Sequence, residues 1–509
     1  MKKYLMSRLM RCAMFCCIPL ASGLLCMPSP HALAAAGPGT SPAASAPLTL
    51  GTELATRPWH GDLDGMITRG VIRVLTVNSK TFYFVNKGVQ RGLVYDTFRL
   101  FEDELNSRLV KQGKHRHKHL KVKIVFIPVG RSELLPALKA GKGDVVAGGL
   151  TMTPERLREA DFSVPSVRNV SEVVVSRADA APLAGPESLS GREVFVRKSS
   201  SYYDSLTALN RRLAQQGKPA VMIRLAPDVL EDEDLIEMVN AGLVPLIIVD
   251  KPIADFWRQV FTNIAVHEAA AVRVSGDLGY AIRKNSPLLK TALDDFLGRH
   301  GQGDAMRNIL LQRYLKSTRF VKDATSAAER RKFEDLVSFF RKYGDRYSVD
   351  WVLMAAQGYQ ESGLDQEVRS KAGAIGVMQV MPATARELDV GDIRKIEPNI
   401  HAGVKYMRWM IDQYYGKEPM TQLDKALFAF ASYNAGPARI AKLRKEAAER
   451  GLDPNVWFHN VEYIAAERIG AETVTYVSNI FKYYIAYTLI LENREKKQQA
   501  VRQLQQPIR

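Results

Sequence analysis

Hydrophobic and polar positions divide the chain into two parts with different periodicities. From about residue 60 to 315, short apolar runs alternate with stretches of helical periodicity. Strands separated by helices of this length predict α/β units with parallel sheets. The expected strands cover residues 71–77, 122–127, 144–148, 194–196 and 246–249, and helical patterns such as 95–109 and 134–140 lie between them.

From about residue 328 to 493 the pattern contains almost no β-type run, and helical periodicity continues throughout. We therefore predict two domains, an α/β domain at 59–315 and an all-α domain at 332–491. The remaining segments are expected to be a flexible leader rich in Ala, Pro, Ser, Gly and Thr at 37–58, a polar linker at 316–331, and a charged tail at 492–509 that forms a solvated or frayed helix.

The first 36 residues have the organisation of a secretory signal peptide. Four basic residues (Lys2, Lys3, Arg8 and Arg11) precede an apolar run at 12–27, and small residues at 32–36 offer a cleavage site. The apolar run is interrupted by Pro19 and is too short for a membrane anchor. All four cysteines lie in this segment, so we expect the exported chain to lack disulfides, a Cys-based zinc site and a cysteine nucleophile.

The chain carries 71 Lys+Arg against 54 Asp+Glu, a net charge of +17 that export would lower to +13. Such a charge suggests nucleic acid, an anionic membrane surface or an acidic polymer as partner. The most basic segment, 111–123, holds six Lys and Arg together with His115, His117 and His119. In an exported protein we expect a solvated loop or a contact with anionic lipid or polymer there, and no nucleic-acid binding. No acidic residue or cysteine completes a metal site, and we expect no cofactor.

A candidate catalytic carboxylate lies at the end of the first strongly apolar helix of the second half. Ser348 can cap this helix, and its apolar positions follow the i, i+3, i+4, i+7 spacing (Val349, Val352, Leu353, Ala356). Glu361 falls in the last turn before Gly363, where lost solvation and the helix dipole both raise a carboxyl pKa. A carboxyl that stays protonated near neutrality can act as a general acid. On this segment alone, a surface glutamate at a helix end is an equal alternative.

Five motifs in order resemble the catalytic domain of the soluble lytic transglycosylase family, which has a goose-type lysozyme-like fold. They are Glu361-Ser362 and the segments 371–385, 399–407, 429–437 and 472–480. The resemblance implies that Glu361 is the single catalytic acid/base and that Ser362 polarises the substrate. It also implies a substrate groove formed by Met378, Gln379, Tyr433, Asn434 and Tyr476, the last beside the carboxylate. Taken singly, Tyr433 and Tyr476 could be core aromatics and Gln379 a helix-capping amide.

The same resemblance implies the glycan strands of peptidoglycan as substrate. Retaining glycosidases use two carboxylates, but no second one belongs to the matched motifs, and Asp365 is expected to be a turn residue. Glu361 would protonate the oxygen between N-acetylmuramic acid and N-acetylglucosamine and then deprotonate the C6 hydroxyl, closing a 1,6-anhydro ring. This is a lyase reaction. The sequence does not exclude some hydrolysis beside this reaction, and it does not distinguish exolytic from endolytic cleavage.

Segments of the first half resemble the family 3 periplasmic solute-binding proteins. These segments are 69–74, 92–96, 143–156, 161–165 and 278–284. The resemblance implies two α/β lobes that close on a ligand at their hinge, with Gly149, Thr151 and Arg156 on the carboxylate of an amino acid and Asp250 on its amine. An arginine fork suits a carboxylate. Asp250 could instead be a turn residue at a strand end.

In this order the two domains resemble the membrane-bound lytic murein transglycosylase F type. The resemblance implies an exported protein of the periplasm, peripherally associated with the outer membrane, whose enzyme domain is regulated by an amino acid or muropeptide bound to the first domain. A periplasmic solute receptor or sensor with a non-catalytic helical domain is the alternative.

Overall fold

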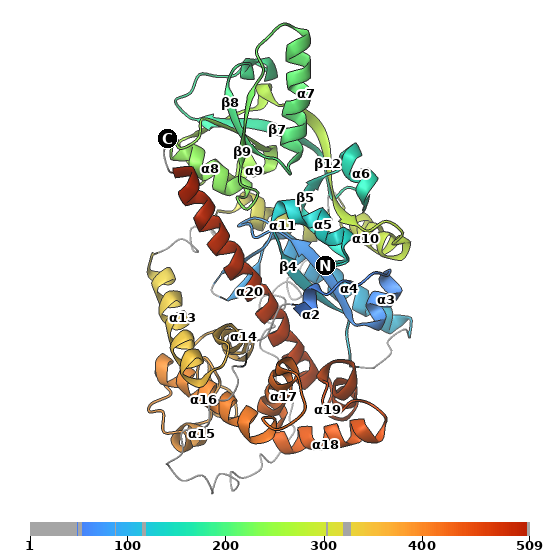
Figure 1. Ribbon diagram of the computed structural model, residues 1–509, viewed down its shortest axis with the longest axis vertical. Coiled ribbons are helices and arrows are strands. Elements are labelled where there is room, and N and C mark those ends of the chain that lie inside the picture. The colour runs from blue at the N-terminus through green and yellow to red at the C-terminus, as the bar shows by residue number, and fades with distance from the viewer. Residues whose placement is uncertain are drawn as a thin grey trace, which may run out of the picture. The chain divides into compact units, whose positions relative to one another are not determined.

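The computed structural model describes Leu48 and residues 53–86, 88–113, 119–301, 304–318 and 327–505, which all belong to one compact unit (Figure 1). The predicted signal peptide with its cysteines, most of the leader, His115 and His117, and half of the predicted linker lie outside the described residues.

The first lobe of the α/β domain is built on parallel strands β1 (Val71–Thr76), β4 (Lys123–Pro128) and β5 (Val145–Thr151). Strands buried on both faces give near-continuous apolar runs, and β1 is buried from Ile72 onward. The other elements of this lobe are α2 (Glu53–Thr56), α3 (Leu63–Thr68), β2 (Phe84–Asn86), β3 (Val89–Arg91), α4 (Leu93–Lys111), η1 (Arg131–Glu133), α5 (Leu134–Lys139), α6 (Pro154–Glu159), β6 (Asp161–Phe162), α10 (Pro287–Arg299), α11 (Ala305–Leu311) and η4 (Gln312–Lys316).

The second lobe contains β8 (Glu193–Arg197), β9 (Met222–Ala226) and β10 (Leu246–Asp250), which run parallel. Its sheet is covered on both faces, because successive residues of the strand at 173–175 alternate between two separate hydrophobic clusters. The other elements are η2 (Pro186–Leu189), α7 (Ser201–Gln215), α8 (Asp232–Asn240), α9 (Lys251–Trp257), β11 (Ile264–His267) and η3 (Glu268–Ala270).

Two long antiparallel strands join the lobes. β12 (Arg273–Ile282) pairs with β5 of the first lobe and with β7 (Val167–Arg177), which in turn pairs with β10 of the second. One sheet therefore runs through both lobes in the order β4-β1-β5-β12-β7-β10-β8-β9. The expectation of parallel sheets was incomplete, since the connecting strands are antiparallel.

The second domain is entirely helical, so the predicted fold class, a two-lobed α/β domain followed by an all-α domain, is confirmed. Its elements are α13 (Ala327–Tyr347), α14 (Trp351–Ser362), α15 (Pro382–Glu387), α16 (Ile396–Tyr414), α17 (Gln422–Ala435), α18 (Pro437–Glu449), η5 (Trp457–Val461), α19 (Glu462–Ile469) and α20 (Ala471–Gln505). The predicted cap of α14 was wrong. Asp350 accepts from the Val352 N–H, while Ser348 has a left-handed backbone with φ 52°.

Helix α20, drawn in red in Figure 1, contacts α17, α19 and the edge strand β4. Near its end, Lys497 donates to the Asn78 carbonyl in the first lobe (2.9 Å) and to Asp234 in the second (2.8 Å). Ala500 is buried in a core cluster of the second lobe. The tail is helical and mostly exposed from 492 to 503, as predicted, because these residues continue α20. The prediction missed the contacts of Lys497 and Ala500 with the lobes.

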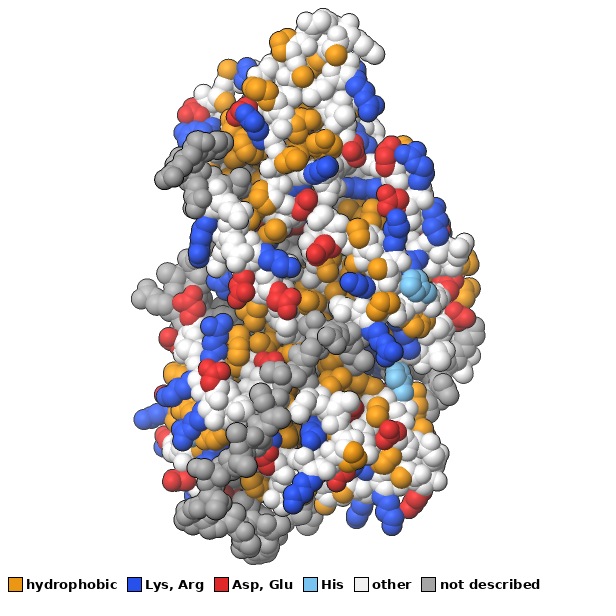
Figure 2. Space-filling view, in the orientation of Figure 1, with side chains coloured by type: hydrophobic (Ala, Val, Ile, Leu, Met, Phe, Trp, Pro, Cys, Tyr) orange, Lys and Arg blue, Asp and Glu red, His pale blue; other side chains and the backbone are white. Residues whose placement is uncertain are grey.

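Charge and hydropathy add two observations. On the face seen in Figure 2, basic and acidic side chains are interspersed rather than gathered by sign. Among the described residues, no helix combines the length and the apolar character needed to cross a bilayer.

Candidate active site

Glu361 lies in the last turn of α14, a helix buried from Val352 to Gly358. The helix ends at Gly363, whose φ of 67° is the left-handed conformation that glycine adopts without strain. Glu361 is only partly exposed, and burial raises the pKa of its carboxyl to about 7. The group is thus half-protonated near neutrality, as the position of Glu361 at the end of a buried helix predicted.

Tyr476 of α20 donates a hydrogen bond from its hydroxyl to Glu361 Oε1. This bond favours the carboxylate and opposes the effect of burial on the Glu361 pKa. Gln357, one turn before Glu361 on α14 and fully buried, donates from Nε2 to the Tyr476 oxygen at 3.2 Å. Sequence reasoning missed Gln357; a polar residue on the most apolar stretch of the helix was the available signal.

Asp365 does not supply a second acid, because it is exposed and its Oδ1 accepts from the Glu367 N–H at 2.8 Å, as expected of a turn residue. Among the residues that the structure describes, burial and the Tyr476 hydroxyl are what shift the Glu361 pKa. The site is therefore built around one carboxyl group whose proton affinity is set by its surroundings rather than by a charged partner.

Ser362 ties the end of α14 to the following loop. Its hydroxyl lies 2.9 Å from the Val377 carbonyl and 3.3 Å from the Gly358 carbonyl, and its oxygen accepts from the Asp365 N–H. Because the Ser362 hydroxyl donates its hydrogen bond to a backbone carbonyl, it positions the loop beside Glu361. The role on the substrate that the resemblance implies stays a prediction.

Met378 and Gln379 are also held inside the protein. The Met378 side chain is fully buried, and it packs so closely on α16 that a Cβ at Gly403 would lie 2.6 Å from its Cγ. Gln379 Nε2 donates to the carbonyls of Gly376 (2.9 Å) and Val368 (3.2 Å). The Met378 side chain therefore fills the space under the loop. That the loop itself lines a substrate groove stays a prediction.

Tyr433 and Asn434 bring the end of α17 to the same place. The Tyr433 hydroxyl donates to the Met378 carbonyl at 2.8 Å, and the nearby Glu361 carboxylate adds to burial in raising the Tyr433 pKa well above its usual value. Asn434 Oδ1 accepts from the Thr473 hydroxyl at 2.7 Å, which joins α17 to the start of α20. Two tyrosines, Tyr433 and Tyr476, thus lie near Glu361. The bond between Asn434 and Thr473 holds together the two helices that carry these tyrosines.

The four residues predicted for the first domain are only partly brought together. Gly149, Thr151 and Arg156 line a small cavity between the lobes, of about 20 Å³, together with Arg131, Arg197 and Ser199–Tyr202. The Arg156 guanidinium donates hydrogen bonds to two backbone carbonyls, those of Thr151 and Ser199, both at 2.9 Å. A cavity of this size has room for about one water molecule, so the lobes are closed on each other.

Asp250 is not in the cavity wall. It is buried behind Tyr202, whose oxygen accepts from the Asp250 N–H at 3.1 Å, and burial raises the Asp250 pKa well above its usual value. The lobes are instead bridged by an ion pair that the sequence did not reveal, Arg131 with Glu231 at 2.7 Å. No group of three potential metal ligands occurs among the described residues.

Two parts of the chain match known families. Residues 338–455 match the transglycosylase SLT domain, and residues 72–316 match the bacterial extracellular solute-binding proteins, family 3. The first match contains Glu361, Met378 and Tyr433, and the second contains the cavity between the lobes. The first match therefore contains the Glu361 side of the active site but ends before Tyr476.

Relatives extend over most of the chain. The membrane-bound lytic murein transglycosylase F of Desulfosudis oleivorans is 29% identical over 82% of this chain and 89% of its own length. The proteins of that name from Ectopseudomonas mendocina and Pseudomonas fluorescens are 28% identical (87% of this chain, 91% of the relative) and 27% identical (83% and 86%).

Among solved structures, an ancestral amino acid-binding protein that is a precursor of cyclohexadienyl dehydratase is 25% identical, with a TM-score of 0.38, over 50% of this chain and 99% of its own. An ancestral arginine-binding protein bound to arginine is 22% identical, with a TM-score of 0.38, over 48% and 98%.

Proposed function

Because the chain is a lytic murein transglycosylase of the membrane-bound F type, we propose that Glu361 cleaves peptidoglycan between N-acetylmuramic acid and N-acetylglucosamine and leaves 1,6-anhydro ends. The observation that carries this proposal is the lone, half-buried carboxyl with a pKa of about 7. A group that titrates near the working pH can serve as acid in one step and as base in the next.

The proposed reaction needs no other ionisable group. The Glu361 carboxyl gives its proton to the glycosidic oxygen as the bond between that oxygen and C1 breaks and the N-acetylglucosamine leaves with the new hydroxyl. In the same step the 2-acetamido oxygen of the N-acetylmuramic acid bonds to C1. The Glu361 carboxylate then removes the proton of the C6 hydroxyl, whose oxygen displaces the acetamido group from C1. The hydrogen bond from Tyr476 stabilises the carboxylate between these two steps.

The test compares Glu361→Gln with Asp365→Asn on purified sacculi. Glutamine keeps the shape of the side chain and cannot transfer a proton, so Glu361→Gln should release no soluble fragments, whereas Asp365→Asn should retain wild-type activity. Undiminished release by Glu361→Gln would refute the enzyme assignment and favour a receptor with a non-catalytic helical domain.

For the first domain we propose that an amino acid or a muropeptide binds between the lobes and regulates cleavage. The family 3 match supports this. The contacts of Lys497 give such a ligand a route to the enzyme domain, because α20 touches both lobes and also carries Tyr476. If so, stem peptides should change the cleavage rate of the wild type, and Lys497→Met should reduce that change. An unchanged rate over a full peptide titration would contradict regulation.

We also propose that the protein acts in the periplasm, at the inner face of the outer membrane. The predicted signal peptide and the membrane-bound relatives support this location. Fractionation of cells should find the protein with outer membranes and high salt should release it; recovery in the cytoplasm would contradict export.

A further inference from the structure

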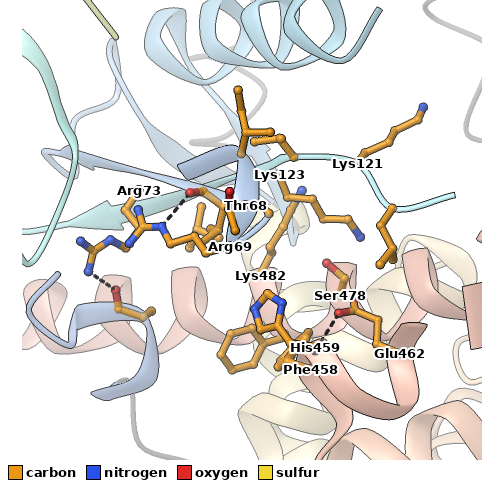
Figure 3. A pocket seen from close by; sticks show the side chains of 18 of the residues that line it. Thr68, Arg69, Arg73, Lys121, Lys123, Phe458, His459, Glu462, Ser478 and Lys482 are labelled. Atoms are coloured by element: carbon orange, nitrogen blue, oxygen red, sulfur yellow. Dashed lines mark hydrogen bonds between the residues drawn. The ribbon is translucent and has the colours of Figure 1, made fainter. Parts of the chain in front are cut away.

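A second cavity, of about 630 Å³, lies between the first lobe and the helical domain (Figure 3). Its walls come from α3, β1 and β4 on one side and from η5, α19 and α20 on the other. It is separate from the cavity between the lobes, with which it shares no lining residue, and it contains none of the residues around Glu361. Its volume falls within the range of small-molecule sites, about 300–1,000 Å³.

Apolar groups form much of the wall. The Arg69 guanidinium stacks on the Trp59 ring, 3.7 Å from its centroid, and the rings of Phe458 and Phe481 pack 5.4 Å apart on the opposite side. Aliphatic side chains complete this part of the lining (Ile67, Val71, Leu109, Leu120, Val122, Val125). The cavity can therefore hold the apolar part of a ligand.

The charged groups of the lining are unbalanced. Six are basic (Arg57, Arg69, Arg73, Lys121, Lys123, Lys482) and one is acidic, Glu462. Arg69 and Arg73 both pair with Asp144 behind the wall. Lys482 has a loose partner in Glu102, 3.9 Å away. Three basic groups of the lining remain, Arg57, Lys121 and Lys123, against the single carboxyl of Glu462.

Lys123 is the most unusual of these groups. Its Nζ is inaccessible to solvent and has no hydrogen-bond partner within the part of the chain that the structure describes. A buried ammonium without a partner is unfavourable, and burial, with a further effect of Lys482, lowers the Lys123 pKa to about 7. Two carboxylates, Glu462 and Glu102, act in the opposite direction and raise the Lys123 pKa, while Arg99 lowers it further. Figure 3 places Lys123 and Lys482 on the same cavity as Ser478 and His459.

We propose that this cavity binds a small amphipathic anion whose apolar body lies against Trp59 and the phenylalanines. The stem of Lys123 lines the cavity while its Nζ is buried behind the wall, so the side chain rotates to bring the ammonium onto the carboxylate or phosphate. Such an anion supplies the partner that Lys123 lacks and offsets the excess positive charge. Its position between the domains means that it contacts the first lobe and α20 together, two turns or less from Tyr476. The same chemistry is offered by a free fatty-acid-like anion and by an anionic lipid.

The binding test uses full-length protein and decanoate, with decyltrimethylammonium as the cationic probe of equal chain length. Decanoate should bind, and Lys123→Met should weaken binding at least tenfold. Lys218→Met, which removes an exposed lysine of the second lobe, should stay within twofold of wild type. Thr68→Trp, which fills the mouth from an exposed position, should weaken decanoate as Lys123→Met does. Removing an unpartnered buried charge should not impair folding, so Lys123→Met remains a usable variant.

Proton uptake gives an independent readout. An anion beside Lys123 raises its pKa above about 7, so calorimetry at pH 8 in two buffers of different ionisation enthalpy should detect uptake in the wild type and none in Lys123→Met. Flotation with phosphatidylglycerol vesicles identifies the source, since retention that depends on Lys123 indicates a lipid and its absence indicates a free anion. The proposal is overturned if decanoate does not bind, if Lys123→Met binds it as tightly as wild type, or if the cationic probe binds equally well.

Discussion

Replacing Tyr476 with phenylalanine removes a hydrogen bond that stabilises the Glu361 carboxylate, and the consequence should be visible in the pH dependence of cleavage. The reaction starts from protonated Glu361, so kcat/KM of the wild type should fall as pH rises through about 7. Without the Tyr476 hydroxyl the carboxylate is less stable, and Glu361 keeps its proton to higher pH. The alkaline limb of the profile should therefore move upward.

The size of this movement follows from the contacts. A hydrogen bond to a charged group contributes about 1.5–3 kcal/mol, and one pH unit corresponds to about 1.4 kcal/mol, so the limb should move by about one to two pH units. We expect the lower end of this range, because a protonated Glu361 can itself donate to the Tyr476 oxygen in the wild type.

The assay is release of soluble muropeptides from sacculi between pH 5 and about 9.5, with each profile normalised to its own maximum. Tyr414→Phe is the matched control, since Tyr414 is an exposed tyrosine at the end of α16 in the same domain. A Tyr476→Phe profile that coincides with the wild type, or moves to lower pH, would refute the assignment of Tyr476 as the group that sets the Glu361 pKa.

Three further predictions follow from the same structure. Gln357→Leu should move the alkaline limb in the same direction as Tyr476→Phe but by less, about half a pH unit or below, because Gln357 acts only through the Tyr476 oxygen; an equal or opposite movement would contradict this relay. Glu361→Gln should stabilise the protein at pH 8 by up to about 3 kcal/mol in urea unfolding and by nothing near pH 4, because a carboxyl pKa raised from 4.5 to about 7 weakens the fold only as pH rises through that interval; a gain that is the same at both pH values would argue against it. Glu231→Gln leaves Arg131 buried without its partner across the lobes and should destabilise the first domain by about 3 kcal/mol. Glu187→Gln should change it little, because Glu187 is a half-buried residue of η2 that forms no ion pair with any described residue.

The chain order of the motifs was enough to predict the enzyme domain and the position of Glu361, because a buried helix that ends in Glu-Ser-Gly leaves a carboxyl with little solvent. The same pattern could not say which motif residues face the substrate. Met378 and Gln379 follow the family's spacing, yet one fills the core beneath Gly403 and the other bonds to loop carbonyls. Spacing identifies a loop; packing decides the direction of each side chain.

Long-range pairing escaped sequence reasoning for a related reason. β7 and β12 are separated by about a hundred residues and pair antiparallel, and Arg131 and Glu231 are equally distant in sequence. Nothing in local periodicity specifies such partners. The contacts at the charged end of α20 escaped prediction in the same way, because nothing in its Lys- and Gln-rich sequence marks Lys497 and Ala500 as the positions that the lobes cover.

The central claim is that one carboxyl, Glu361, performs both proton transfers without water as a reactant. The most direct measurement is mass spectrometry of the fragments that the wild-type protein releases from sacculi in water enriched in heavy oxygen. The account predicts ends that are one water lighter than hydrolysed ends and that carry no heavy oxygen from the solvent. Ends of full hydrolysed mass that contain solvent oxygen would contradict it.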